Sequence, residues 1–109
     1  MVNKDKQISE KISNEASLIA EFLEGVDFER FASDERTRRA ICMTLINIGE
    51  LVKILSDEFR HENNHIPWRA IAGLRDVTAH RYQTLRFEDI WETVTKDIPE
   101  LLELISKIM

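Results

Sequence analysis

The sequence predicts a single all-α domain of four or five helices. It holds only 3 Gly and 2 Pro in 109 residues, too few for a turn-rich β architecture. Long stretches of Leu, Ile, Ala, Glu, Lys and Arg favour helix, and apolar residues recur every three or four positions. The length suits one modest core, so residues 1–109 are expected to form one helical bundle.

The first helix is predicted from about Lys4 to Leu23, where apolar residues recur at helical spacing. Gly25 follows as a suitable C-terminal stop. The next segment, residues 26–33, is expected to be a connector of about one helical turn.

A second, long helix is predicted from a cap at Ser33 or Asp34 through about Arg60. Its wide apolar stripe indicates burial on two sides, but such a seam also occurs where a helix meets its own copy across a dimer axis. Both interpretations stay open. Gly49 in mid-helix lowers helix stability by about 1 kcal/mol relative to Ala. A glycine at such a position is expected where another backbone comes close. The stripe steps by four and three through Ile41, Leu45, Ile48, Val52, Leu55 and Phe59.

The last helical pattern begins after Thr84 and continues to the end of the chain. Pro99 falls inside it, and proline removes a backbone donor from a helix interior. The sequence therefore predicts either one kinked helix or two short ones, the second capped by Asp97.

Charge is distributed unevenly along the chain. The formal net charge is -5, which argues against indiscriminate nucleic-acid binding. Residues 68–86 hold four Arg against one Asp, a net +3 that leaves -8 on the remainder. A basic spot on an acidic body suits a single phosphate group. One cysteine, Cys42, within an apolar run, and no signal-like or membrane-length segment lead us to expect a cytoplasmic protein with Cys42 in its core.

Three functional side chains, Arg75, His80 and Tyr82, lie toward the end of a short predicted helix that Pro67 opens. Arg75 falls on the apolar face of that helix, which is expected to end between Ala79 and Tyr82, so its guanidinium needs an anion or acceptors beside it. Histidine suits proton transfer near neutral pH, and arginine suits holding a phosphate and its transition-state charge. A histidine and an arginine together are suited to RNA cleavage in which the 2′-hydroxyl attacks the adjacent phosphate. This reaction requires no metal ion.

The spacing of these residues leaves two interpretations open. In an unbroken helix His80 would point about 140° away from Arg75, so either the helix ends first or the site combines two chains. The alternative is structural: Arg75 caps carbonyl groups, and His80 sits at a helix C-terminus where a cation is favoured.

Two other clusters contain side chains that could bind a metal ion or RNA. Residues 61–65 match the zinc-protease pattern H-E-x-x-H, which requires both histidines on one regular helix and a third ligand downstream. They fall in a predicted break over residues 61–66, so a polar helix end is the simpler interpretation. Four arginines near the start of the long helix are expected to form a solvated, ion-paired face rather than an RNA path: Arg30, Arg36, Arg38 and Arg39.

The segment R-D-V-T-A-H-R-Y resembles the R-x-x-x-x-H-x-Y signature of the HepT-like toxins of the HEPN superfamily. The segments N-I-G-E, I-P-W-R-A-I-A-G-L-R, F-E-D-I-W-E-T-V and D-I-P-E-L-L also resemble family segments, in the same order. The resemblance implies an all-α, HEPN-like homodimer with two signatures facing each other. It also implies a metal-independent endoribonuclease without a cofactor, paired with a minimal nucleotidyltransferase antitoxin.

The resemblance also assigns roles within the signature. Arg75 would bind the scissile phosphate, His80 would be the acid and base, and Asp76 would help to position the site. Arg81 would contact the RNA backbone. Tyr82 matches the tyrosine to which the antitoxin attaches AMP. The alternative from the same superfamily is a non-catalytic module that binds a nucleotide or a partner protein.

Overall fold

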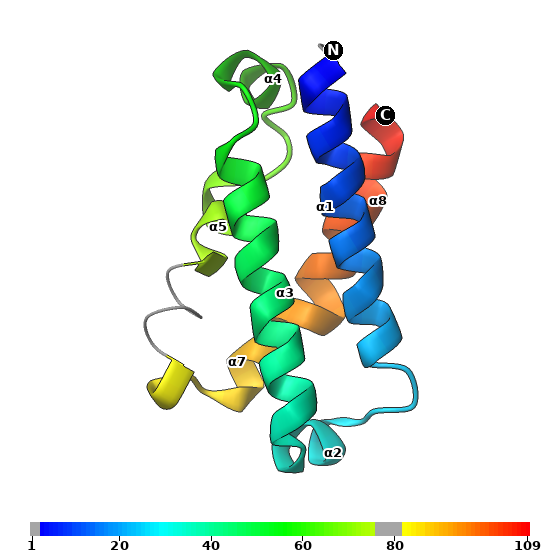
Figure 1. The fold of residues 1–109 in the computed structure, drawn as a ribbon, viewed down its shortest axis with the longest axis vertical. Helices are drawn as coiled ribbons and strands as arrows, with labels where there is room; N and C mark the ends of the chain where they lie inside the picture. The colour runs from blue at the N-terminus through cyan, green and yellow to red at the C-terminus, as the bar shows by residue number, and fades with distance from the viewer. Residues whose placement is uncertain (1–2, 76–81) are drawn as a thin grey trace.

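The computed structural model describes residues 3–75 and 82–109, and the regular elements in these ranges are all helical (Figure 1). No helix among these residues is long and apolar enough to cross a membrane. The helical elements confirm the predicted all-α class. The elements are α1 (Asn3–Phe22), α2 (Phe28–Ser33), α3 (Glu35–Lys53), α4 (Asp57–Glu62), α5 (Trp68–Ala72), η1 (Tyr82–Thr84), α7 (Phe87–Glu92), η2 (Thr93–Asp97) and α8 (Ile98–Ile108).

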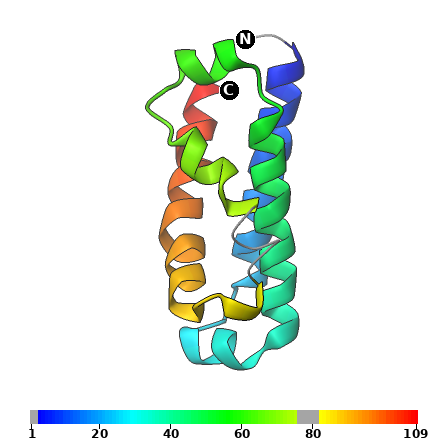
Figure 2. The ribbon, with the colours of Figure 1, turned by 90° about the vertical axis from the view of Figure 1, so that its left-hand side faces the viewer.

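Three long helical stretches run along the length of the molecule. Figure 1 shows α1 descending and α3 ascending beside it, joined at one end by α2. Figure 2 shows the continuous run of α7, η2 and α8 as a second layer, with α5 lying between this layer and α3. Gly25 has a positive φ of 72° in the α1–α2 connection, as expected of a glycine that ends a helix.

The central position of α3 follows from its apolar stripe. The stripe is buried within a single chain, and α3 packs against α1 on one side and α5 on another. Of the two interpretations left open, core packing is thus correct for this stripe. Its side chains are at most 3% exposed: Ile41, Leu45, Ile48, Val52, Leu55 and Phe59.

The long helix predicted through Arg60 is wrong in one respect, because it ends at Lys53 and α4 starts at Asp57. Ser56 makes the break: its hydroxyl accepts from the Phe59 backbone N–H at 3.1 Å, as an N-cap does. The buried carboxylate of Asp5 in turn accepts from the Ser56 N–H at 2.9 Å and from its hydroxyl at 2.7 Å. A contact 51 residues away in sequence thus fixes the helix end.

Pro99 does not separate two helices. The chain stays helical from Phe87 to Ile108, and residues 93–97 widen into a π-helical turn in which the Ile98 N–H reaches the Thr93 carbonyl. This wider turn accommodates Pro99, whose backbone nitrogen has no hydrogen to donate. Asp97 has helical dihedral angles and makes no side-chain cap, so its predicted capping role is wrong.

Cys42 is buried in the core, as predicted. Burial raises the pKa of its thiol to about 11, although the nearby Arg38 and Arg39 oppose the shift. At pH 8 the thiol therefore stays protonated and enclosed. We expect a thiol reagent such as DTNB to leave the native protein unlabelled for hours and to label Cys42 fully in 6 M guanidinium. Rapid labelling of the native protein would contradict the buried position.

Candidate functional site

Arg75 lies where the end of α5 meets α3. The helix α5 stops at Ala72, a turn follows at Gly73, and residues 74–75 return to helical backbone. The Arg75 side chain is one-third exposed, and its Nε forms an ion pair with the Glu50 carboxylate of α3. The sequence-based expectation that this half-buried guanidinium needs an anion is confirmed.

Gly49 makes this contact possible. A Cβ at position 49 would lie 2.9 Å from the Arg75 backbone nitrogen, 3.0 Å from its Cβ and 3.1 Å from the Ala72 carbonyl oxygen. The backbone of the candidate site therefore rests directly on α3, and the expected close approach of a second backbone is confirmed. Gly49 thus leaves room for the Arg75 backbone, and the adjacent Glu50 pairs with the Arg75 side chain.

Tyr82 begins η1 and is half-buried against the core. The guanidinium of Arg39 lies 4.7 Å from the centroid of its ring, within the range of a cation–π contact. The Tyr82 hydroxyl is buried and has no hydrogen-bond partner among the described residues. Among the described residues, Tyr82 is therefore held by contacts of its ring.

Both described ends of the signature contact the same side of α3. Glu50 and Arg39 are eleven positions apart on one helix, which places them on nearly the same face and roughly 16 Å apart. Three predicted site residues, Asp76, His80 and Arg81, lie outside the described residues, as does part of the expected helix end at residues 79–82. Their assigned roles remain predictions.

Comparison with known proteins decides the family. The sequence matches the family described as "Ribonuclease HepT-like" over residues 12–108, nearly the whole chain. This chain belongs to the HepT-like ribonuclease family. It is 40% identical to a "Putative RNase" of Caldanaerobacter subterraneus subsp. tengcongensis, covering 92% of this chain and 89% of that protein. It is 34% identical to the "Probable ribonuclease HepT" of Thermococcus cleftensis, covering 99% and 98%. No solved structure matches the chain.

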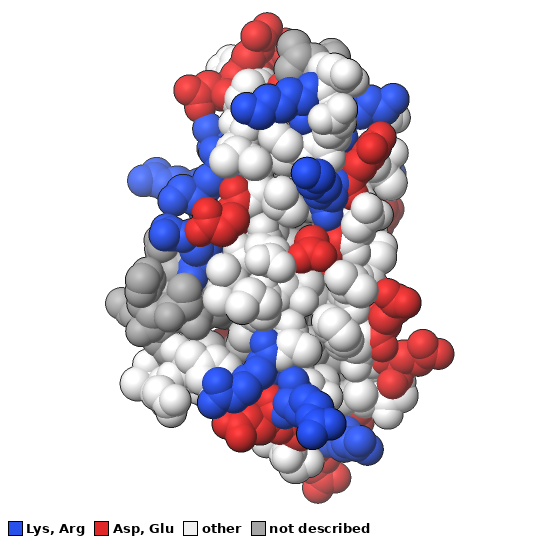
Figure 3. Space-filling model, in the orientation of Figure 1, with Lys and Arg blue, Asp and Glu red and all other residues white. Residues whose placement is uncertain are grey.

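Figure 3 shows basic side chains of this HepT-like chain at several places on one face, among them a group beside α5 and a group near the start of α3. The second group is ion-paired in part, since Arg39 contacts Glu35 at 3.1 Å and Arg30 contacts Asp34 at 3.6 Å. These pairs confirm the expected solvated face for Arg30 and Arg39.

Arg38 departs from that expectation because it is buried. Its Nη1 donates to the carbonyl oxygens of Phe31 at 2.9 Å and Ala32 at 2.7 Å, and its guanidinium lies 4.1 Å from the Phe87 ring centroid. Arg38 therefore ties the end of α2 to α3 and α7. Helical periodicity places it near the apolar stripe, but periodicity alone does not reveal that carbonyl groups would face it.

The zinc pattern does not form a regular helical face. The helix α4 ends at Glu62 with Asn63 as its C-cap, so His61 lies on the helix and His65 lies beyond it. Within residues 3–75 and 82–109 there is no group of three His, Cys, Asp or Glu side chains placed to hold a metal ion. The zinc-hydrolase interpretation has no support in this geometry.

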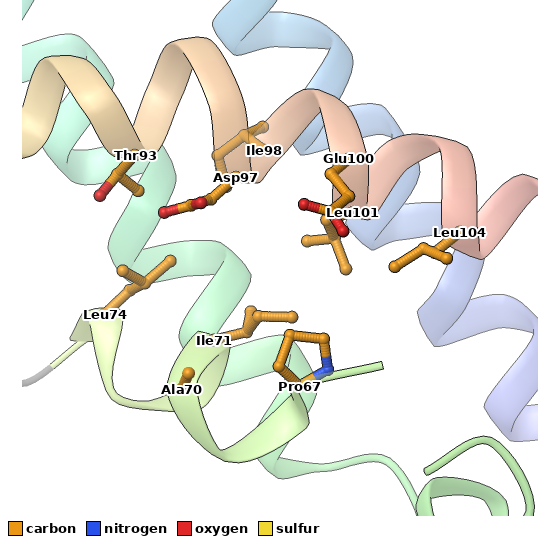
Figure 4. A pocket seen from close by; sticks show the side chains of 10 residues that line it. All are labelled: Pro67, Ala70, Ile71, Leu74, Thr93, Asp97, Ile98, Glu100, Leu101 and Leu104. Carbon is orange, nitrogen blue, oxygen red and sulfur yellow. The ribbon is translucent and has the colours of Figure 1, made fainter. Parts of the chain in front are cut away.

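A groove of about 210 Å³ opens between α5 and the η2–α8 run. Figure 4 shows side chains of both elements pointing toward it. The described residues that line it are mostly apolar, and they include the carboxylates of Asp97 and Glu100 but no Lys or Arg. This groove is therefore unsuited to an RNA phosphate.

Sequence reasoning identified Arg75 and Tyr82 but assigned no role at the site to their partners on α3. Glu50 stood out only within the N-I-G-E segment, and Arg39 only within a charged cluster. The available signal was Gly49, a costly residue in mid-helix that marked where the site backbone would touch α3.

We expect Gly49→Ala to lower the free energy of unfolding by about 1–2 kcal/mol, because the clash with the Arg75 backbone outweighs the gain in helix propensity. Urea unfolding followed by circular dichroism measures this. Gly73→Ala is the comparison variant and should cost less, since its Cβ would be less crowded, at 3.3 Å from the Ala70 carbonyl oxygen and 3.5 Å from that of Arg69. A Gly49→Ala protein as stable as the wild type would show that α3 and Arg75 are not in close contact.

Proposed function

We propose that this chain is the toxin of a toxin–antitoxin pair and a metal-independent endoribonuclease. Membership of the HepT-like ribonuclease family supports the enzyme class. One observation supports the place of the chemistry: Arg75, a signature residue, is fixed against α3 by Glu50 while one-third of its side chain stays exposed. An oriented, exposed guanidinium is suited to a phosphate group.

In the proposed reaction the RNA 2′-hydroxyl attacks the adjacent phosphorus and the 5′-oxygen leaves. His80 removes the proton of the 2′-hydroxyl and supplies one to the leaving oxygen. Arg75 binds the phosphate and stabilises the charge that develops on it. Asp76 positions the site, and Arg81 contacts the RNA backbone. All groups come from the protein, so the mechanism needs no metal ion.

A homodimer would bring Arg75 and His80 of two chains into one cleft. The exposed face of α3 supports this arrangement, because Met43 is 57% exposed and Ile54 is 54% exposed. Met43 lies on α3 and Ile54 is its C-cap, eleven positions later, so both lie on the side of α3 that also carries Arg39 and Glu50. Burying them against a second copy would stabilise the dimer and bring the two signatures together.

The proposed antitoxin is a minimal nucleotidyltransferase that attaches AMP to Tyr82. Because the Tyr82 hydroxyl is buried, it must become accessible before it can react. The attached phosphate would add negative charge beside the site and repel RNA. The modification would thus act as an electrostatic switch.

We expect Arg75→Ala and His80→Ala each to lower RNA cleavage by at least 100-fold in the presence of EDTA, because each removes a group that takes part directly in the reaction. Cleavage of a labelled RNA and growth inhibition on expression both measure this. Arg30→Ala is a suitable control because Arg30 is exposed and paired with Asp34 on the α2 side. Wild-type cleavage by a folded His80→Ala protein would refute the assigned acid and base.

We expect co-expression with a neighbouring nucleotidyltransferase to add mass in AMP units and to abolish cleavage. Intact-mass spectrometry and peptide mapping should place the addition on Tyr82, and Tyr82→Phe should prevent it. A folded, dimeric protein with neither added mass nor cleavage would instead favour a non-catalytic binding module.

A further inference from the structure

We propose that Glu50 is a positioning residue for Arg75, so that RNA cleavage depends on a carboxylate outside the signature. The ion pair between the Arg75 Nε and the Glu50 carboxylate links the signature to α3. This inference rests on the proposed function, because it concerns the turnover of RNA at that site.

Stability alone does not account for the role of this pair. The Glu50 side chain is 51% exposed and that of Arg75 is 33% exposed. Ion pairs with this exposure contribute little to the free energy of unfolding, since water screens them and ordering both side chains costs entropy. Their main physical effect is to restrict the directions in which the guanidinium can point.

Glu50 lies on a firmly packed part of α3. Residues 49 and 50 lie within α3, whose neighbouring residues Ile48 and Val52 are fully buried. The backbone nitrogen and Cβ of Arg75 sit directly on Gly49. The main chain of Arg75 is thus located by Gly49 and its side chain by Glu50. A guanidinium held in this way needs little reorganisation when charge develops on a phosphate.

Glu50 has a second, opposing effect on RNA binding. Its negative charge lies beside the guanidinium and repels a phosphate in the ground state. Removing that charge should therefore leave the KM for RNA unchanged or lower it, while loss of orientation lowers kcat. This split distinguishes positioning from a general binding role, for which KM would rise.

The test is steady-state cleavage of a labelled RNA by the wild type, Glu50→Gln, Glu50→Asp and Glu103→Gln. Glu103 is the matched control, because it forms an exposed ion pair with Lys107 on α8. We expect Glu50→Gln to lower kcat at least tenfold with KM unchanged or lower. Glu50→Asp keeps the charge and should recover part of the loss, and Glu103→Gln should match the wild type.

Three results would overturn the inference: a Glu50→Gln kcat within twofold of the wild type, a higher KM with unchanged kcat, or a loss that follows the unfolded fraction measured by circular dichroism. Failure of the proposed function is distinguishable. In that case the folded wild-type dimer itself would not cleave RNA, and the inference would fall with it.

Discussion

The close approach of α3 to the end of α5 is the constraint on which the candidate site depends. Any side chain at position 49 would collide with the backbone of Arg75, so the absence of one allows the two segments to touch. Contact at this point brings the Arg75 guanidinium within reach of Glu50. The helix that carries the largest share of the core therefore also locates the one signature cation that the structure describes.

Two buried polar contacts hold α3 at its ends. Near its start, Arg38 bonds to the last carbonyl groups of α2 and stacks on Phe87 of α7. Beyond its end, Asp5 of α1 binds Ser56, which caps α4. Removing either charged group would leave partly buried partners without these hydrogen bonds, which would lower the free energy of unfolding. These contacts make α3 a fixed support for Arg75 and for Tyr82.

Local chemistry was predictable from the sequence, and long-range polar contacts were not. Apolar spacing predicted the helical class and the central position of α3, and the placement of Arg75 on an apolar face predicted a nearby anion. The break at Ser56 escaped prediction because it depends on Asp5, far away in sequence. The π-helical turn before Pro99 also escaped, because a proline alone does not indicate how a helix will accommodate it.

The most direct test of this account is the binding of an uncleavable, 2′-O-methyl RNA to the wild type and to Arg75→Gln across a range of salt concentrations. If Arg75 is a phosphate ligand held by α3, the variant should bind about tenfold more weakly, and the slope of log K against log salt should fall by about one per site. Equal affinities and equal slopes, from two equally folded proteins, would contradict the account.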